Sequence, residues 1–170
     1  MLYVLIGAPG SGKSTWCRHR MMDNDYVQKW ERISRDDIRF SMLKPDEDYF
    51  SHEGEVYEEF VKRIANSLVQ PWVEHTIADA THLSKKAREL LFSSVDKYLP
   101  QNFKYEVVFV YFDVPLSTCL ERNAKRTGRT LVPEETIKNM YKSISFPSLN
   151  ECHSFKNSEC VLDKIYIVRE

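Results

Sequence analysis

The sequence predicts an α/β protein with a mainly parallel central sheet and helices on both faces. Short apolar runs alternate with helical periodicities from end to end, which is typical of parallel strands joined by helices. The segment GAPGSGKS at residues 7–14 also fits G-x-x-x-x-G-K-[ST], between an apolar run at 2–6 and a helix that begins with Lys13–Arg20. Strand, glycine-rich loop and helix in this order predict the P-loop NTPase fold.

A loop of this sequence is expected to bind nucleotide phosphates. Its glycines let successive backbone N–H groups point at phosphate oxygens, and the helix N-terminus adds positive potential. We expect Lys13 to reach the β and γ phosphates and the Ser14 hydroxyl to ligate Mg²⁺. The other interpretation, a glycine-rich turn with a surface lysine, is disfavoured by the flanking strand and helix. The predicted nucleotide-binding residues of the loop are Pro9, Gly10, Ser11, Gly12, Lys13, Ser14 and Thr15.

The length of the chain predicts a single domain spanning residues 1–170, and its charge predicts that any polyanion is bound locally. The formal net charge of −1 argues against a basic surface that wraps duplex nucleic acid. No apolar run approaches the roughly 18 residues of a membrane span, and the chain starts directly with the first predicted strand. We therefore expect a soluble, cytoplasmic protein that has no membrane partner.

The four cysteines have no framework spacing, which favours reduced thiols. They are Cys17, Cys119, Cys152 and Cys160. A metal site built from Cys152, His153 and Cys160 is the less favoured alternative, because the spacing matches no common zinc pattern.

The elements of the first half follow in order. Trp30–Ser34 is predicted as a strand, Asp36–Leu43 as a helix that ends before Pro45, and the acidic segment Asp46–Glu55 as a surface loop. Thr76–Asp79 is predicted as the next strand. Between them, helical spacing predicts a long helix ending near Val69 from the apolar residues Tyr57, Phe60, Val61, Ile64 and Leu68.

Ser84 is expected to cap a further helix, and the apolar run Tyr105–Phe112 to form a strand buried on both faces. Gly128 is expected to end the helix that starts after Pro115, and Ser145–Glu159 to be irregular before a last strand at Lys164–Val168. Another helix is expected to start at Pro133. The predicted buried stripes of these helices are Ala87, Leu90, Leu91 and Val95, then Leu116, Cys119, Leu120 and Asn123, then Ile137, Met140, Tyr141 and Ile144.

Two carboxylates and two guanidiniums follow the second predicted strand, where a phosphate acceptor would approach. Asp36 or Asp37 could take the proton of an attacking hydroxyl. Arg35 and Arg39 lie one turn apart and could hold an anionic part of the acceptor. The alternative is that one aspartate caps the helix and the other charges are solvated.

A basic cluster crowds the end of the helix after Pro115 and predicts a lid around residues 122–132. It comprises Arg122, Lys125, Arg126 and Arg129, of which Arg122 and Arg126 share a helix face at i, i+4. Arginines closing over a triphosphate would stabilise the transferring group. Cations that merely complement the helix dipole are an equal alternative.

Two further aspartates end predicted strands. Asp79, followed by Thr81, is expected near the metal or the acceptor, whereas Asp113 is interpreted as a helix N-cap. Trp16 in the first helix is expected to pack in the core rather than stack on a base.

With these residues described, the chain resembles the kinase domain of phage-type 5′-hydroxyl polynucleotide kinases, a P-loop family. The likeness covers 7–16, 33–42 with its RDDxxR element, and 112–144 with FDVP, ERNxKR and MYKS. The phosphate loop is common to many NTPases, but the other two segments are much more selective. The resemblance implies transfer of phosphate from ATP, with Mg²⁺, to the 5′-hydroxyl end of RNA or DNA.

The resemblance also implies residue roles. Asp36 would be the general base, Arg39 would contact the phosphate of the acceptor nucleotide, and Arg122 and Arg126 would act on the donor phosphates. Lys13 and Arg126 join Asp36 as predicted catalytic residues, and the predicted acceptor side comprises Arg35, Arg39, Asp79 and Thr81. The acidic stretch Asp46–Glu59 borders that side and would repel a long nucleic acid unless it faces away.

The resemblance also bears on the partners of this protein, and two other functions are considered beside it. Many relatives carry a phosphatase or ligase domain on the same chain, and this chain is too short for either, so a separate phosphatase or ligase would complete end healing. The alternative function is a P-loop kinase acting on the hydroxyl of a nucleoside, sugar or antibiotic. A module that binds ATP without transfer is disfavoured by the joint presence of an acid, a metal-binding hydroxyl and lid arginines.

Overall fold

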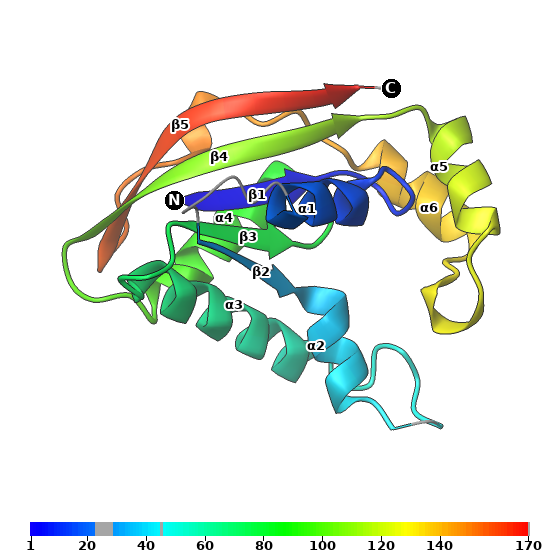
Figure 1. The fold of residues 1–170 in the computed structure, drawn as a ribbon, viewed down its shortest axis with the longest axis horizontal. Coiled ribbons are helices and arrows are strands. Elements are labelled where there is room, and N and C mark those ends of the chain that lie inside the picture. Colours follow the sequence, from blue (N-terminus) through cyan, green and yellow to red (C-terminus); the bar gives the residue numbers. More distant parts are fainter. Residues whose placement is uncertain (23–28, 45, 170) are drawn as a thin grey trace.

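Five parallel strands form the centre of the structure, a computed structural model that describes residues 1–22, 29–44 and 46–169 (Figure 1). Their spatial order is β2-β3-β1-β4-β5. The strands are β1 (Leu2–Ile6), β2 (Trp30–Ser34), β3 (His75–Asp79), β4 (Phe103–Asp113) and β5 (Ser158–Arg169). The predicted mainly parallel sheet is confirmed.

The central strand β1 is buried on both faces, which explains its uninterrupted apolar sequence. Leu2, Val4 and Ile6 pack into one hydrophobic core, whereas Tyr3 and Leu5 point into the other. The alternation of side chains along a strand therefore builds two cores from one run.

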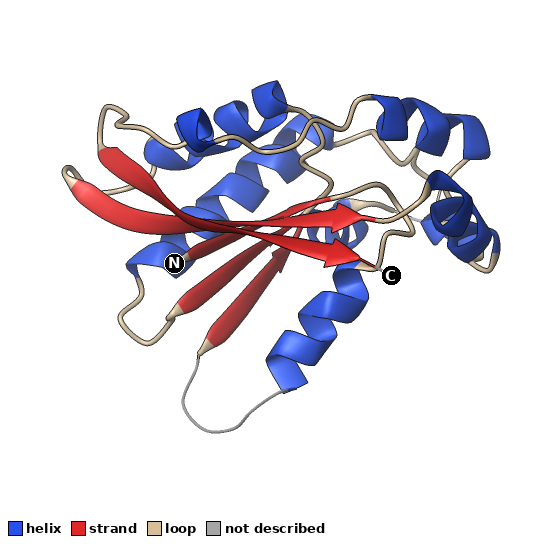
Figure 2. Cartoon of the chain, turned by 90° about the horizontal axis from the view of Figure 1, so that it is seen from above, coloured by secondary structure: helices blue, strands red, loops and turns tan. Residues whose placement is uncertain are grey.

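Helices cover both faces of the sheet, as Figure 2 shows from above. They are α1 (Lys13–Met22), α2 (Arg35–Met42), α3 (Glu53–Val69), α4 (Lys85–Asp96), α5 (Leu116–Ala124) and α6 (Glu134–Lys142). Buried residues of α2, α3 and α4 belong to the first core, and those of α1, α5 and α6 to the second.

Serine side chains set the starts of two helices. Ser34 Oγ accepts the backbone N–H of Asp37 at 3.1 Å, so α2 begins at Arg35, one residue before the predicted start. The interpretation of an aspartate as N-cap is thus wrong. Ser84 Oγ accepts the N–H of Ala87 at 3.2 Å, which confirms the predicted cap of α4.

Two predicted loops are shorter in the structure. The acidic segment expected to be a loop to Glu55 ends earlier, because α3 begins at Glu53. The last strand starts at Ser158 rather than Lys164, within the segment Ser145–Glu159 that was expected to be irregular. Its first half pairs with β4, and Asp96 accepts the hydroxyl of Ser158 at 2.7 Å, so pairing and hydrogen bonds replace the missing apolar alternation.

Three local predictions at helices are wrong. Leu90 is exposed, because Arg88, Leu91 and Val95 form the buried face of α4. Asp113 is no N-cap: it ends β4 and pairs with Arg169 of β5 at 3.2 Å, while the cap position of α5 is Pro115, without a side-chain bond.

The third error concerns the end of α5. Gly128 does not end this helix, which stops at Ala124. The side chain of Asn123 instead bonds Val132 twice, donating to its carbonyl at 2.7 Å and accepting its N–H at 3.1 Å. These two bonds close the base of the lid loop, and Gly128 opens the short 3₁₀ turn Gly128–Thr130 inside it.

An ion pair between Arg88 and Glu151 is fully buried between α4 and the 3₁₀ turn before β5. Arg88 Nε donates to Oε2 of Glu151 at 2.5 Å, and its second terminal nitrogen donates to Oε1 at 2.8 Å. The remaining guanidinium nitrogen donates to the carbonyls of His82, Leu83 and Ser145. Arg88 therefore fastens three chain segments at one point.

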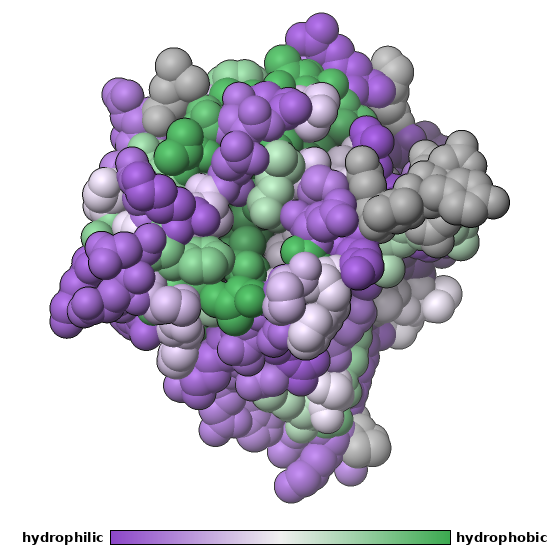
Figure 3. All heavy atoms as spheres, turned by 60° about the vertical axis from the view of Figure 1, so that its left-hand side comes forward, coloured by the Kyte–Doolittle hydropathy of each residue, from purple (hydrophilic) through white to green (hydrophobic). Residues whose placement is uncertain are grey.

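Among the described residues, no helix has the length and apolarity to cross a bilayer. The face turned forward in Figure 3 is mostly hydrophilic, with hydrophobic residues gathered in its middle.

Glu151→Ala would leave the Arg88 guanidinium buried without its counter-charge. We expect the free energy of unfolding in urea to fall by about 3–5 kcal/mol. The matched control is Glu159→Ala, which removes a surface partner of Lys104 and should cost clearly less. Equal losses for the two variants would contradict a fastening role for the buried pair.

Candidate active site

The candidate site lies at the carboxyl ends of the strands, where loops from β1, β2 and β3 meet the segment after β4 (Figure 1). In open parallel sheets this edge is where ligands bind. The glycine-rich loop at residues 7–12 connects β1 to α1 there, as the sequence predicts.

Two glycines of the loop adopt backbone conformations that other residues rarely take. Gly10 has φ of 84° and Gly12 has φ of 95°. A Cβ atom on Gly10 would lie 2.3 Å from the carbonyl oxygen of Cys119. The loop tip therefore packs directly on the backbone of α5, the helix that leads into the lid.

Lys13 Nζ lies inside the curve of this loop. It donates to the carbonyl oxygens of Gly7 and Ala8, both at 2.8 Å. Burial lowers the pKa of Lys13 to about 8, and the nearby Asp79 opposes that shift. Arg126 adds to the lowering, whereas Asp36 raises this pKa. The charges of three predicted site residues thus converge on one ammonium group.

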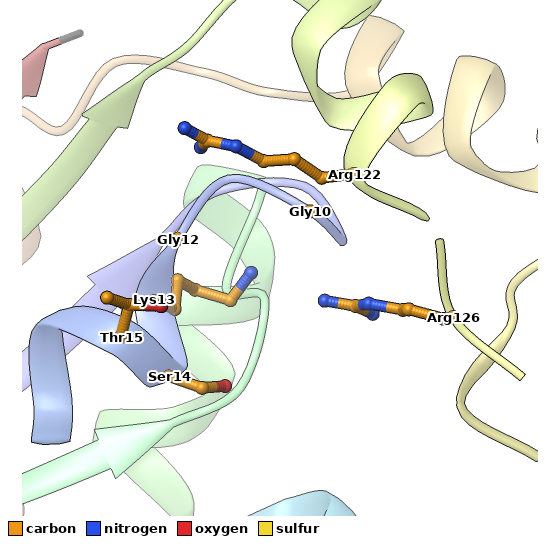
Figure 4. A pocket seen from close by; sticks show the side chains of 7 residues that line it. All are labelled: Gly10, Gly12, Lys13, Ser14, Thr15, Arg122 and Arg126. Carbon is orange, nitrogen blue, oxygen red and sulfur yellow. The ribbon is translucent and has the colours of Figure 1, made fainter. Parts of the chain in front are cut away.

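A cavity of about 200 Å³ opens beside Lys13 (Figure 4). In this view Arg126 extends from the lid loop toward the amino group of Lys13, and Arg122 crosses above the glycine-rich loop. Its lining residues are Gly10, Gly12, Lys13, Ser14, Thr15, Arg122 and Arg126. Most of the predicted nucleotide-binding set is therefore brought together, but Pro9 and the buried Ser11 do not line this cavity.

The two lid arginines reach the cavity from different segments. Arg122 belongs to α5, but Arg126 follows the helix end, so the expected common helix face does not exist. The lid loop carries Arg126 around to the Lys13 side instead (Figure 4). Arginines can consequently approach a bound phosphate chain from two directions.

The hydroxyl of Ser14 is exposed at the first turn of α1, beside the cavity. Within the described ranges, no three His, Cys, Asp or Glu side chains are grouped closely enough to hold a metal ion. Mg²⁺ commonly takes one or two protein ligands and completes its shell with phosphate oxygens and water. The Ser14 hydroxyl beside a cavity that could hold phosphates fits this mode of Mg²⁺ coordination.

Asp36 stands at the start of α2 with its side chain 65% exposed. Its Oδ1 accepts a hydrogen bond from Arg39 at 2.7 Å and another from the Tyr49 hydroxyl at 2.8 Å. These two bonds orient the carboxylate and leave its second oxygen for another proton donor. Burial, followed by the charge of Asp36, raises the pKa of Tyr49 to about 12, so this hydroxyl stays a donor at neutral pH.

Arg35 and Arg39 share a counter-ion that the sequence interpretation missed. Glu53, the first residue of α3, accepts from Arg35 through Oε1 and from Arg39 through Oε2. Arg39 is 5% exposed and also lies over the ring of Tyr49, 4.4 Å from its centroid. Burial, followed by the charge of Arg39, lowers the pKa of Arg35. The predicted acceptor-binding arginines are thus both held in place by one carboxylate.

Arg32 of β2 holds two more aspartates. Its guanidinium contacts Asp79 Oδ2 at 2.6 and 2.8 Å and Asp37 Oδ2 at 2.7 Å. Asp79 is 7% exposed, and burial raises its pKa against the pull of Arg32. Thr81, two residues on, accepts the N–H of Gly7 through its carbonyl at 3.1 Å, which joins the β3 loop to the phosphate loop.

A second cavity, of about 380 Å³, adjoins the first at Arg122, which lines both. Trp16 packs edge-on against Phe112, as predicted for a core residue, and also lines this cavity. The remaining lining residues are Ser11, Gly12, Thr15, His19, Val114, Val168 and Arg169. The second cavity thus adds apolar side chains, Trp16, Phe112, Val114 and Val168, to a lining that is otherwise mainly polar or charged.

The sequence interpretation missed Arg32, Tyr49 and Glu53. The sequence held one indirect signal, since Arg35 and Arg39 on one helix face require a counter-charge and acidic residues follow nearby. It held none for Tyr49, whose hydroxyl reaches Asp36 only through the fold of the loop between α2 and α3.

A family model described as an AAA domain matches residues 2–147. Among curated proteins, one from Autographa californica nuclear polyhedrosis virus, provisionally named bifunctional polynucleotide kinase/RNA ligase, is 26% identical over 148 residues. The match covers 83% of this chain and 20% of the viral protein, so the chain spans one fifth of that relative's length.

Solved structures show the same fold. A chain of the Pnkp1/Rnl/Hen1 RNA repair complex is 26% identical with a TM-score of 0.65, covering 84% of this chain and 43% of that one. A fungal RNA kinase has a TM-score of 0.60 at 14% identity, covering 98% of this chain and 73% of the other. The second likeness concerns the fold alone.

The lowered pKa of Lys13 predicts a pH-dependent affinity for ATP. A bound phosphate chain favours the protonated amine, so affinity should be level below pH 8 and weaken by up to tenfold per pH unit above it. Titration calorimetry at pH 8.5 in two buffers of different ionisation heat should show proton uptake on binding.

Lys13→Met is the control, because it should bind more weakly at neutral pH and lose the pH step. An affinity of the original protein that stays constant between pH 7 and 9.5 would contradict the assignment.

Proposed function

Because the chain belongs to the AAA domain family, we propose that it is an ATP-dependent kinase that phosphorylates the 5′-hydroxyl end of RNA or DNA. One observation carries the proposal: the glycine-rich loop with Lys13 and the lid arginines Arg122 and Arg126 line one cavity, although they come from separate segments. A phosphate-binding ammonium and a lid guanidinium thus share this cavity, and the carboxylate of Asp36 at the start of α2, oriented by Arg39 and Tyr49, is the candidate proton acceptor. The names of the viral relative and of the RNA repair complex support a polynucleotide acceptor.

The transfer is a single in-line displacement. The acceptor's 5′ oxygen forms a bond to the γ-phosphorus while the bond to the oxygen bridging the β and γ phosphorus atoms breaks, and ADP leaves. Asp36 takes the proton of the attacking hydroxyl, with its carboxylate oriented by Arg39 and Tyr49. Lys13 and Arg126 stabilise the charge on the transferring group.

The donor fills both cavities in this proposal. The triphosphate lies along the glycine-rich loop, and the nucleoside enters the second cavity beside Trp16 and Phe112. Ser14 would hold Mg²⁺ with phosphate oxygens and water, and the ion would neutralise charge on the β and γ phosphates. Arg122, at the junction of the cavities, is suited to the α and β phosphates.

The name of the viral relative joins a polynucleotide kinase with an RNA ligase, and the solved chain belongs to an RNA repair complex. We therefore include a ligase, with or without a separate phosphatase, among the proposed partners. The four cysteines are free thiols in the structure, which supports a reducing, cytoplasmic setting.

An acceptor screen tests the proposed function. The protein is incubated with γ-labelled ATP and, separately, with 5′-hydroxyl RNA, 5′-hydroxyl DNA, a nucleoside, a sugar and an aminoglycoside. We expect label on the oligonucleotides. Labelling of a small molecule alone would support the alternative small-molecule kinase, and labelling of none would count against both.

Asp36→Ala should abolish transfer and leave ATP affinity within a few fold, because this carboxylate acts on the acceptor. Single-turnover label transfer and equilibrium ATP binding measure the two effects. Asp37→Ala is the matched control, since this neighbouring carboxylate pairs with Arg32 and should be largely dispensable for chemistry. Loss of ATP binding in Asp36→Ala would refute the assignment.

Arg126→Ala should lower turnover roughly a hundredfold or more by removing charge stabilisation on the transferring group. Lys125→Ala, which removes a surface ion pair with Glu121, should retain nearly full turnover. Steady-state rates with a saturating oligonucleotide compare the two. If both variants kept full turnover, the result would favour the alternative interpretation, in which Arg126 only complements the helix dipole.

A further inference from the structure

Three aromatic residues of α2 and the loop that follows it form a chain that becomes more exposed toward the solvent. Phe40 packs edge-on against Tyr49, and Tyr49 packs edge-on against Phe50 with ring centroids 4.9 Å apart. Phe40 and Tyr49 are half-buried, whereas Phe50 is 64% exposed. The ring of Phe50 is therefore exposed to solvent while the ring of Tyr49, which itself packs on Phe40, supports it.

This ring lies next to the residues that orient the reacting carboxylate. The neighbouring Tyr49 donates its hydroxyl to Asp36, and the guanidinium of Arg39 lies 5.9 Å from the centroid of the Phe50 ring. One side of the ring thus faces Arg39 and Tyr49, and its exposed part is available to a ligand. Tyr49 therefore links Phe50 to Asp36, since it packs on the ring and donates its hydroxyl to the carboxylate.

Two acidic residues near Phe50, Glu47 and Asp48, form hydrogen bonds within the loop. Asp48 Oδ1 accepts the backbone N–H of Phe50 at 2.9 Å. Glu47 accepts the N–H of Lys44 at 2.9 Å and contacts His52 at 3.2 Å. Glu47 and Asp48 therefore brace the turn that presents the ring, so these two acidic residues have a structural role.

The lid reaches the same loop from the donor side. Arg129 donates to the carbonyl oxygen of Lys44 at 2.9 Å, across 85 residues of sequence. The lid is therefore joined directly to the start of the loop that carries Tyr49 and Phe50.

We propose that Phe50 is the stacking platform for the base of the acceptor's 5′-terminal nucleotide. This inference rests on the proposed polynucleotide kinase function and names the residue that recognises its substrate. A base is flat, uncharged and apolar on its faces, so it can lie on an exposed aromatic ring even beside braced carboxylates. Because every base has such a face, the contact favours nucleotides over sugars without selecting one base.

The test crosses a residue change with a substrate change. Steady-state kcat/KM is measured for the original protein and for Phe50→Ala, each with an intact 5′-hydroxyl oligonucleotide and with the same oligonucleotide carrying an abasic tetrahydrofuran at its 5′ end. We expect Phe50→Ala to lose about 5- to 150-fold on the intact acceptor. On the abasic acceptor, the variant and the original protein should differ by less than twofold.

Two further variants separate stacking from bulk. Phe50→Trp should keep or raise kcat/KM, whereas Phe50→Leu, which is apolar without an aromatic face, should resemble Phe50→Ala. Trp72→Ala is the matched control, because Trp72 is 57% exposed in the turn between α3 and β3, at the opposite end of the strands. The Trp72→Ala variant should leave kcat/KM unchanged for both the intact and the abasic acceptor.

The outcomes distinguish this proposal from the proposed function. Phosphorylation of the intact oligonucleotide by the original protein tests the function by itself. Given that activity, an unchanged Phe50→Ala, or equal losses on the intact and abasic acceptors, would overturn the stacking role.

Discussion

The close approach of Gly10 to the carbonyl oxygen of Cys119 is the constraint on which the site depends. No side chain fits between them, so the phosphate loop rests on the backbone of α5. That contact fixes the start of the lid relative to the loop, and the paired hydrogen bonds of Asn123 to Val132 fix its end. Arg122 and Arg126 are consequently directed at a cavity that the loop itself forms.

The acceptor side is organised by charge pairing rather than by an excess of positive charge. Arg32, Arg35 and Arg39 are each bound by carboxylates, which agrees with a chain of net charge −1. Their role in this structure is to set the positions of Asp36, Asp79 and the start of α3. Recognition of a polyanion would then be local, with an oriented carboxylate and an aromatic ring at the entrance and cations around the donor phosphates.

In the proposed kinase, one loop would decide the choice of acceptor. Kinases with different acceptors can share the phosphate loop, because that loop contacts only the donor. The loop between α2 and α3 instead supplies Tyr49 and Phe50 beside Asp36. The hydrogen bonds of Glu47 and Asp48 shape this loop, so its acidic composition has a structural reason as well as an electrostatic effect.

The sequence by itself determined the features that short-range patterns encode. The phosphate loop, β1 and β2 with their observed bounds and the serine cap of α4 could be predicted from spacing and periodicity, whereas spacing left Asp36 and Asp37 open as the candidate base. Only the tertiary structure decided the counter-ions, because Arg32 and Asp79, or Arg88 and Glu151, are 47 and 63 residues apart in the chain. It likewise extended β5 beyond its apolar pattern and turned Leu90 outward, since strand pairing and a buried arginine outweighed local hydrophobicity. Periodicity reports which face of an element is apolar, but partners distant in sequence meet only when the sheet brings them together.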